Sequence, residues 1–183
     1  MRKSLMCVLT ALCLFQGLVY ADTAEAGRLG SRDIDALIRL YGSVGYGSGD
    51  QPNTVSNLYY AGGGQFLKTW GEQILYVGVG VDVGYTHFAQ FKTISGEGNS
   101  RYLNAFLMGE FHLFLINLQL GVGPAFGLGD MSGTSVGFMS GIGLNAPIKP
   151  VGFSAIVRTD WVFDTKTAGS VSFMLALTVP FSY

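Results

Sequence analysis

Apolar side chains recur at every second position along most of this chain, with small or polar residues between them. The pattern is clearest in residues 73–87, where apolar residues from Leu75 to Tyr85 alternate with residues that include three glycines and Asp82. Residues 171–183 repeat the pattern up to the last position. Because successive side chains of a strand point to opposite faces, each segment is predicted to be a strand with one apolar face.

The same alternation predicts eight strands, with clusters of Gly, Pro, Asn and Asp marking the connections. The predicted strands cover residues 36–47, 56–70, 73–87, 100–113, 117–128, 135–145, 151–163 and 171–183. Each is long enough for the ~9–11 residues that a tilted strand needs to cross a bilayer. Residues 88–99 are predicted to form the longest loop. Pro124 lies inside the fifth strand and cannot donate a ladder hydrogen bond there, which weakens that prediction.

The position of the charges decides between a soluble and a membrane protein. A soluble sandwich is the alternative for segment 171–183 taken alone, and a soluble barrel would keep its apolar face inside. Here one face of most strands is apolar, and charges of both signs share the other face with Gly, Ser and Asn. An apolar face without mid-strand charges fits lipid, where Arg or Lys at the midplane would cost ~2–4 kcal/mol. The predicted fold class is an all-β, membrane-spanning, antiparallel up-and-down β-barrel of eight strands.

The polar face is predicted to line the lumen of this barrel. Its titratable side chains form a predicted lumen charge network of Arg39, Asp82, Glu110, His112, Arg158 and Asp160. Its large aromatic side chains, predicted to fill the lumen, are Tyr41, Tyr59, Tyr76, Tyr102 and Phe106. Trp70 and Trp161 lie near strand ends on the apolar face, where membrane barrels carry interfacial aromatic girdles.

The N-terminal residues predict export. Residues 1–21 begin with Arg2 and Lys3, continue as an apolar run and end in Val19-Tyr20-Ala21, a plausible cleavage site, which is the pattern of a secretory signal peptide. A membrane-spanning helix is the alternative, but the run is shorter than the ~20 apolar residues that a span needs. Residues 22–35 are predicted to be a short periplasmic lead-in, and residues 36–183 the barrel. A short helix starting near Ile34 is an alternative for the beginning of the barrel.

Removing the signal peptide changes the composition of the mature chain. Cys7 and Cys13 both lie within it, so the mature protein is predicted to have no disulfide framework. Two of the 11 basic residues also leave, and 9 basic against 12 acidic residues give a net charge of −3. This charge argues against nucleic-acid binding. The sequence shows no metal-ligand spacing, Gly-rich phosphate loop or cysteine nucleophile, so no cofactor is expected.

The C-terminus carries a resemblance to a known class of protein. An alternating final strand that ends in aromatics, here Phe181 and Tyr183, resembles the C-terminal signal that the barrel-assembly machinery reads in bacterial outer-membrane β-barrels. The whole mature chain resembles the small eight-stranded types: the OmpA transmembrane domain, OmpX and OmpW. The resemblance implies integral residence in the outer membrane of a Gram-negative (diderm) bacterium, with both termini in the periplasm. Outer-membrane lipid and the assembly machinery are then the expected partners.

Three functions are compatible with this class. The first is a structural or surface role with a narrow, largely plugged lumen, since eight strands leave room only for side chains or one small ligand. The second, implied by the OmpW resemblance, is a narrow channel for small, partly hydrophobic solutes. The lumen charges have two possible roles under both of these functions. They form ion pairs that fix the barrel register, or they form a gate whose ion pairs exchange partners. The third is a lipid-modifying enzyme, but His87 and His112 have no neighbouring serine in a suitable motif, and no enzymatic activity is expected.

Overall fold

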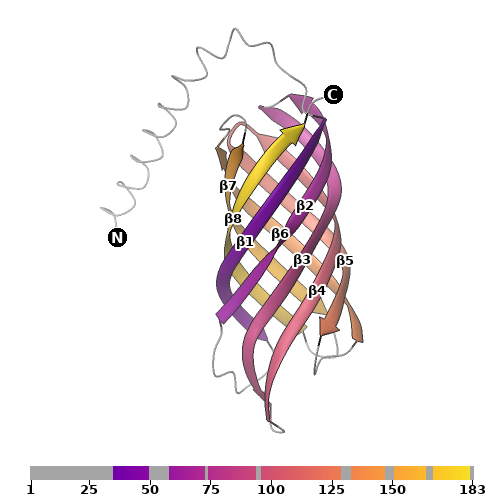
Figure 1. Cartoon of the computed structure of the whole chain (residues 1–183), viewed down its shortest axis with the longest axis vertical. Coiled ribbons are helices and arrows are strands. Elements are labelled where there is room, and N and C mark those ends of the chain that lie inside the picture. The colour runs from indigo at the N-terminus through magenta and orange to yellow at the C-terminus, as the bar shows by residue number, and fades with distance from the viewer. Residues whose placement is uncertain are drawn as a thin grey trace, which may run out of the picture. The chain divides into compact units, whose positions relative to one another are not determined.

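Eight antiparallel strands close into a single barrel. The computed structural model describes residues 35–49, 58–72, 74–93, 96–128, 133–146, 151–163 and 167–181. The strands are β1 (Ala36–Gly49), β2 (Leu58–Glu72), β3 (Leu75–Thr93), β4 (Gly96–Leu113), β5 (Ile116–Leu128), β6 (Gly133–Ala146), β7 (Gly152–Phe163) and β8 (Thr167–Phe181). Each strand pairs with its neighbours in sequence, and β1 pairs with β8 to close the barrel (Figure 1). The predicted fold class is therefore confirmed.

The register of the strands fixes the tilt of the barrel. Starting at Ile38 in β1, the paired residues lead through Phe66, Val81, Leu107, Val122, Phe138, Trp161 and Gly169 back to Ser48 of β1. The circuit returns 48 − 38 = 10 residues further along the same strand. For eight strands this stagger corresponds to a tilt of about 40° and an interior that side chains can fill.

The two faces of the barrel have opposite character. Along β5 and β7 exposed and buried residues alternate almost without exception. The exposed members include large apolar side chains such as Leu120 of β5 and Phe153 of β7. Across the whole barrel, the buried polar residues include both arginines and the three carboxylates of the predicted lumen network. The predicted assignment of faces is confirmed, because an aqueous barrel would have the opposite polarity. Within the described residues, no helix has the length and apolarity to cross a bilayer.

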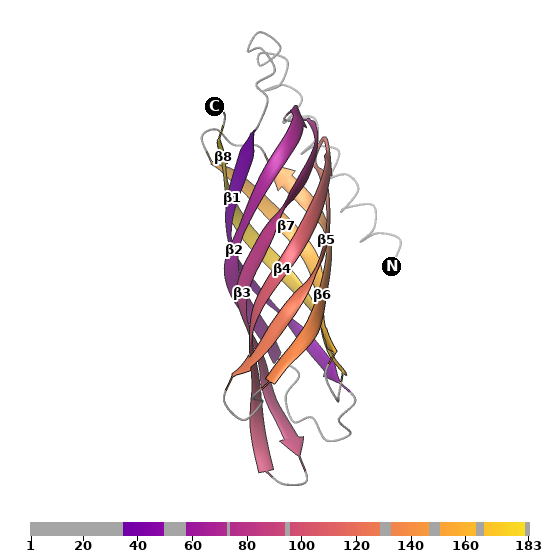
Figure 2. The ribbon, with the colours of Figure 1, turned by 90° about the vertical axis from the view of Figure 1, so that its right-hand side faces the viewer.

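One predicted loop is wrong. Residues 88–99 were expected to form the longest loop, but β3 runs on to Thr93 and β4 already begins at Gly96. The two strands form a hairpin that extends past the other strands (Figure 2), with a register shift between Phe88 and Phe91. Backbone pairing can continue where side-chain alternation fades, so the period-two signal missed this extension.

Other strand ends differ less from the prediction. The last strand begins at Thr167, four residues before the predicted start at Val171. The alternative helix near Ile34 is excluded from Ala36 onward, where β1 begins. The predicted signal peptide (1–21), the lead-in up to residue 34 and Tyr183 lie outside the described residues.

Two prolines occupy positions that explain why strands tolerate them. Pro124 pairs with Val136 on the β6 side, but the β4–β5 ladder is interrupted beside it, between the Asn104–Ala125 and Leu107–Val122 pairs. Pro180 pairs only with β1, because the described pairing of β8 with β7 ends at Thr178. Each proline therefore lies where its missing N–H leaves no ladder bond broken.

Candidate functional site

Glycines on the lumen face make room for the large side chains that cross it. A methyl group at Gly84 would overlap Tyr41 Oη, and one at Gly137 would lie 2.6 Å from Cε1 of Phe106. One at Gly121 would lie 2.8 Å from Cγ of Met139. The space beside these glycines is thus filled by side chains from other strands.

The first of two buried ion-pair clusters is built on Arg39 of β1. Its guanidinium donates to both carboxylate oxygens of Glu110 on β4, at 2.6 and 3.0 Å. It also donates to Gln65 Oε1 at 2.7 Å and to Thr178 Oγ1 at 3.1 Å. Arg39 is completely buried. A bidentate, charge-assisted pair of this kind is strong and directional, so it fixes β1 relative to β4 across the lumen.

Glu110 is held by further donors besides Arg39. Tyr76 Oη donates to Glu110 Oε1 at 2.6 Å, and Gln119 Nε2 donates to Glu110 Oε2 at 2.8 Å. A buried carboxylate needs such partners because it has lost its hydration. The ring of Tyr76 also stacks on His112, with ring centroids 4.5 Å apart. With Gln65 of β2 and Thr178 of β8, the first cluster thereby joins six strands: β1, β2, β3, β4, β5 and β8.

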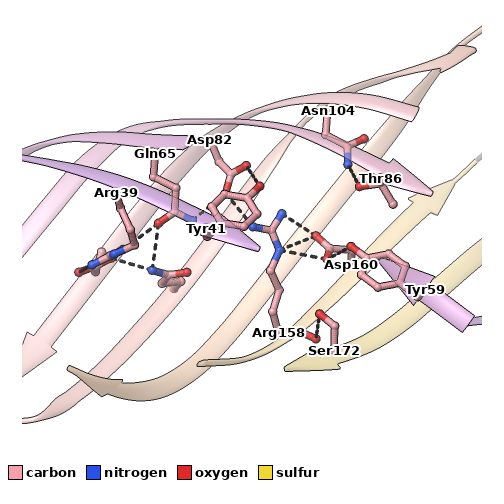
Figure 3. Close-up of polar contacts among 12 residues, drawn as sticks. Arg39, Tyr41, Tyr59, Gln65, Asp82, Thr86, Asn104, Arg158, Asp160 and Ser172 are labelled. Carbon is pink, nitrogen blue, oxygen red and sulfur yellow. Dashed lines mark hydrogen bonds and ion pairs between the residues drawn. The ribbon is translucent and has the colours of Figure 1, made fainter. Parts of the chain in front are cut away.

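The second cluster is built on Arg158 of β7 (Figure 3). The Arg158 guanidinium lies 2.8 Å from Asp160 Oδ1 and 2.8 Å from Asp82 Oδ2 on the far side of the lumen. Tyr41 Oη donates to Asp82 Oδ1 at 2.8 Å, and Tyr59 Oη donates to Asp160 Oδ2 at 2.7 Å. The Arg158 guanidinium carbon also lies 5.1 Å from the centre of the Tyr41 ring. All carboxylate oxygens in this cluster have a donor.

Gln65 of β2 connects the two clusters. Its Oε1 accepts from Arg39, and its Nε2 donates to Asp82 Oδ2 at 2.7 Å. Through this amide the two clusters form one network, which Figure 3 shows reaching from Arg39 to Asp160. We call this network the lumen plug; its charged members are Arg39, Asp82, Glu110, Arg158 and Asp160. With two arginines and three carboxylates, its formal charge is −1.

The remaining predicted site residues lie on the expected faces. Tyr102 and Phe106 are buried inside the barrel, and His112 is buried beside Tyr76. Trp70, Trp161 and Phe181 are partly exposed on the outer face; their roles in an interfacial girdle and an assembly signal stay predictions. Trp161 also covers Gly169 on the neighbouring strand.

Sequence reasoning missed the amides of the plug. Gln65 and Gln119 are nearly fully buried and bond to the ion pairs, yet neither was singled out. The sequence did contain a signal for them. Both residues lie at alternate strand positions that face the lumen, as do charged residues on the strands with which they pair. Three tyrosines were expected to fill space, but Tyr41, Tyr59 and Tyr76 each donate to a carboxylate as well.

His87 lies on the outer face and stacks on Tyr60, with ring centroids 4.5 Å apart. Arg101 pairs with it on β4. No group of three His, Cys, Asp or Glu side chains in the described part of the chain could hold a metal ion.

Comparisons with known proteins extend the picture at the level of structure. No protein-family model matches the chain, and no curated protein sequence matches it. The crystal structure of Ail, the attachment invasion locus protein of Yersinia pestis, matches with 14% sequence identity and a TM-score of 0.57, covering 82% of this chain and 99% of Ail. The backbone structure of the Yersinia pestis outer membrane protein Ail in a phospholipid bilayer nanodisc matches with 15% identity and a TM-score of 0.47, covering 78% of this chain and 99% of that one.

Neisserial surface protein A also matches, with 15% identity and a TM-score of 0.46, covering 81% of this chain and 99% of that protein. The first Ail structure aligns over nearly its whole length. At 14% identity this likeness concerns the fold and not the function. Together with the closed circuit of strands, it shows that this chain has the fold of the small eight-stranded outer-membrane β-barrels.

Proposed function

We propose that this protein is an integral outer-membrane barrel with a structural or surface role, whose lumen is closed by the lumen plug. The observation that carries the proposal is the continuous set of hydrogen bonds from Arg39 through Gln65 to Arg158 and Asp160. These bonds tie opposite walls of the barrel together. A solute could pass only if several charge-assisted bonds broke together.

The exterior supports residence in a membrane. Large apolar side chains are exposed on all eight strands, from Leu40 of β1 to Leu177 of β8. A soluble protein rarely exposes so extensive an apolar surface, whereas lipid solvates it. Closure of β1 on β8 also satisfies the backbone groups that an open edge would leave unbonded in hydrocarbon. Outer-membrane lipid is the proposed permanent partner, and the barrel-assembly machinery the proposed partner during biogenesis.

The proposed orientation places both chain termini in the periplasm. The connections at that end of the barrel follow Glu72, Leu113 and Ala146. The connections at the other end then face outward, together with the extended β3–β4 hairpin (Figure 2). A surface role would then belong to these outward-facing connections and the β3–β4 hairpin.

Neither a catalyst nor a cofactor is part of the proposal. The charged lumen residues are engaged with one another, and His87 on the outer face lies beside an aromatic ring rather than a nucleophile. Mass analysis of the lipid A from cells with and without the protein tests this point. An altered acyl chain in cells that contain the protein would establish the enzymatic alternative.

Loss of the protein from cells tests the structural role. Cells without it should admit more of a bulky hydrophobic dye, and the wild-type chain should restore the barrier. Cells that contain it should take up small solutes no faster than cells that lack it. Faster uptake of small solutes with an unchanged dye barrier would favour the second candidate, a narrow channel for partly hydrophobic solutes.

A further inference from the structure

Apolar side chains cover two connections at the end of the barrel that carries the chain termini. Leu75 of β3, Leu113 of β4 and Ile116 of β5 form the last row of the outer face there, and Ile74 and Phe114 lie beyond it in the connections. We call these five residues the turn patch. We infer that the turn patch is embedded in the inner leaflet of the membrane, where it contacts phospholipid acyl chains and anchors this side of the barrel beyond its strands. The inference rests on the proposed function and orientation.

The turn patch is continuous with the apolar outer face of the strands. Leu75 pairs with Leu113, and Leu113 pairs with Ile116, so the three form one row across neighbouring strands. Ile74 and Phe114 extend this row into the connections and are 53% and 58% exposed. A water-facing turn rarely presents so many large apolar side chains together. Lipid is the proposed solvent of the strands that the patch extends, so the same lipid is the occupant that fits it.

The backbone of the β4–β5 connection suits a place without water. The N–H of Phe114 donates to the carbonyl oxygen of Ile74 at 2.6 Å, and the N–H of Asn145 donates to the carbonyl oxygen of Leu115 at 2.8 Å. The turn is thereby bonded to the β2–β3 connection on one side and to β6 on the other. Backbone groups without a bond are costly in hydrocarbon. These two groups need no water, because protein already satisfies them.

Phe114 combines an exposed ring with an unfavourable backbone conformation. Its φ is 56°, in the left-handed region where Gly and Asn are favoured and a bulky residue is uncommon. Contacts within the protein cover less than half of the residue, which is 58% exposed. An apolar solvent around the ring gives it a favourable contact that offsets the strain.

Charges on the neighbouring strand β2 indicate the level of the lipid headgroups. Lys68 and Glu72 lie on the outer face of β2, where they pair with Val79 and Leu75 of β3. A charged side chain near the end of a lipid-facing strand extends toward the headgroups. Next to these charges, the outer face of β3 and β4 stays apolar from Val79 to Leu75 and on to Leu113. The turn patch therefore lies at the boundary between headgroups and acyl chains, where apolar side chains insert readily.

Tryptophan fluorescence in phosphatidylcholine nanodiscs tests the inference. Trp70 and Trp161 are first replaced by Phe. Phe114→Trp, Glu72→Trp or Leu120→Trp is then added, which gives three barrels with a single tryptophan each. Phospholipid with brominated acyl chains quenches a tryptophan within the bilayer, whereas iodide quenches one in water on either side of the nanodisc.

The brominated lipid should quench Phe114→Trp about half as strongly as Leu120→Trp, whose position lies in the middle of β5. The iodide quenching constant of Phe114→Trp should be about threefold below that of Glu72→Trp, the matched control at the same end of the barrel. Equal iodide quenching of these two variants would overturn the inference, because the turn patch would then lie in water. Shielding of Phe114→Trp from both quenchers would also overturn it, because the ring would then lie against protein.

Leu120→Trp distinguishes failure of the inference from failure of the proposed function. If the brominated lipid quenches Leu120→Trp but not Phe114→Trp, only the inference fails. If it quenches neither, lipid does not surround the barrel and the proposed function fails as well. Should Phe114→Trp not refold, nuclear magnetic resonance of the wild-type barrel decides. A nitroxide on the lipid acyl chains should broaden the amide signals of Ile74 and Phe114 more than a water-soluble gadolinium chelate does, and the reverse order would overturn the inference.

Discussion

Arg39→Met removes the centre of the first ion-pair cluster while keeping a long unbranched side chain in its place. The guanidinium loses two hydrogen bonds to Glu110, one to Gln65 and one to Thr178. Glu110 remains buried with only Tyr76 and Gln119 as donors. Removing one partner of a buried ion pair costs ~3–5 kcal/mol, because the other charge stays desolvated. The free energy of unfolding should therefore fall by about that amount.

A double variant with Arg39→Met and Glu110→Gln separates the free energy of the ion pair from the general cost of the two substitutions. The double variant no longer buries a lone carboxylate, so it should recover part of the loss. The coupling free energy of the double-mutant cycle should then be at least ~2 kcal/mol. The assay is equilibrium denaturant unfolding in detergent, followed by the fluorescence of Trp70 and Trp161, with a heat-modifiable gel shift to confirm folding.

Lys68→Met is the matched control for losing a cation. Lys68 lies on the outer face, is half exposed, and is 3.5 Å from Asp35. A pair of this kind contributes under about 1 kcal/mol, so the control should be nearly neutral. A loss of stability in Arg39→Met as small as that in Lys68→Met would contradict a strong buried ion pair, as would simple addition of the effects of Arg39→Met and Glu110→Gln.

Three further substitutions test other parts of the account, each by its change in the denaturant midpoint. Gly84→Ala should destabilise the barrel by ~1–3 kcal/mol, because the new methyl group overlaps Tyr41 Oη. Gly42→Ala is its control, since nothing lies within 4 Å of the added carbon; equal losses at the two positions would contradict the packed lumen. Leu120→Arg, at an exposed apolar site in the middle of β5, should cost ~2–4 kcal/mol in a bilayer, and a neutral result would argue against lipid on this face. Phe114→Gly should stabilise the barrel by about 1 kcal/mol in detergent, because Phe114 has a φ of 56°; a loss of stability would show that the ring outweighs the strain.

The sequence was sufficient for most of the fold because one strong pattern covers it. The alternation around Val81 and Asp82 has a period of two, and a one-residue slip would turn every charge toward lipid. The assignment of faces was therefore fixed on every strand at once. The extension of β3 to Thr93 could not be predicted this way, because backbone hydrogen bonds and not an apolar face define that part of the hairpin.

The sequence could predict which charged residues line the lumen, but not which of them form ion pairs with one another. The alternation along the strands placed Arg39 and Arg158 in the lumen. It did not show which carboxylate each arginine would contact. Those partners depend on the stagger of ten residues around the barrel, which brings Arg39 to Glu110 three strands away. No local signal encodes that stagger. The role of Gln65 was missed for the same reason, since it matters only once both clusters are in place.

The central claim is that the lumen plug closes the barrel. The most direct test is the single-channel current of the refolded mature chain in a planar bilayer, after a heat-modifiable gel shift has shown that the chain is folded. A closed lumen should give a folded protein without discrete openings. Arg158→Ala should lose stability, because Asp82 and Asp160 lose their shared cation. Discrete, reproducible openings of the wild-type barrel would contradict the claim, and a change in their conductance in Arg158→Ala would show that the plug is a gate.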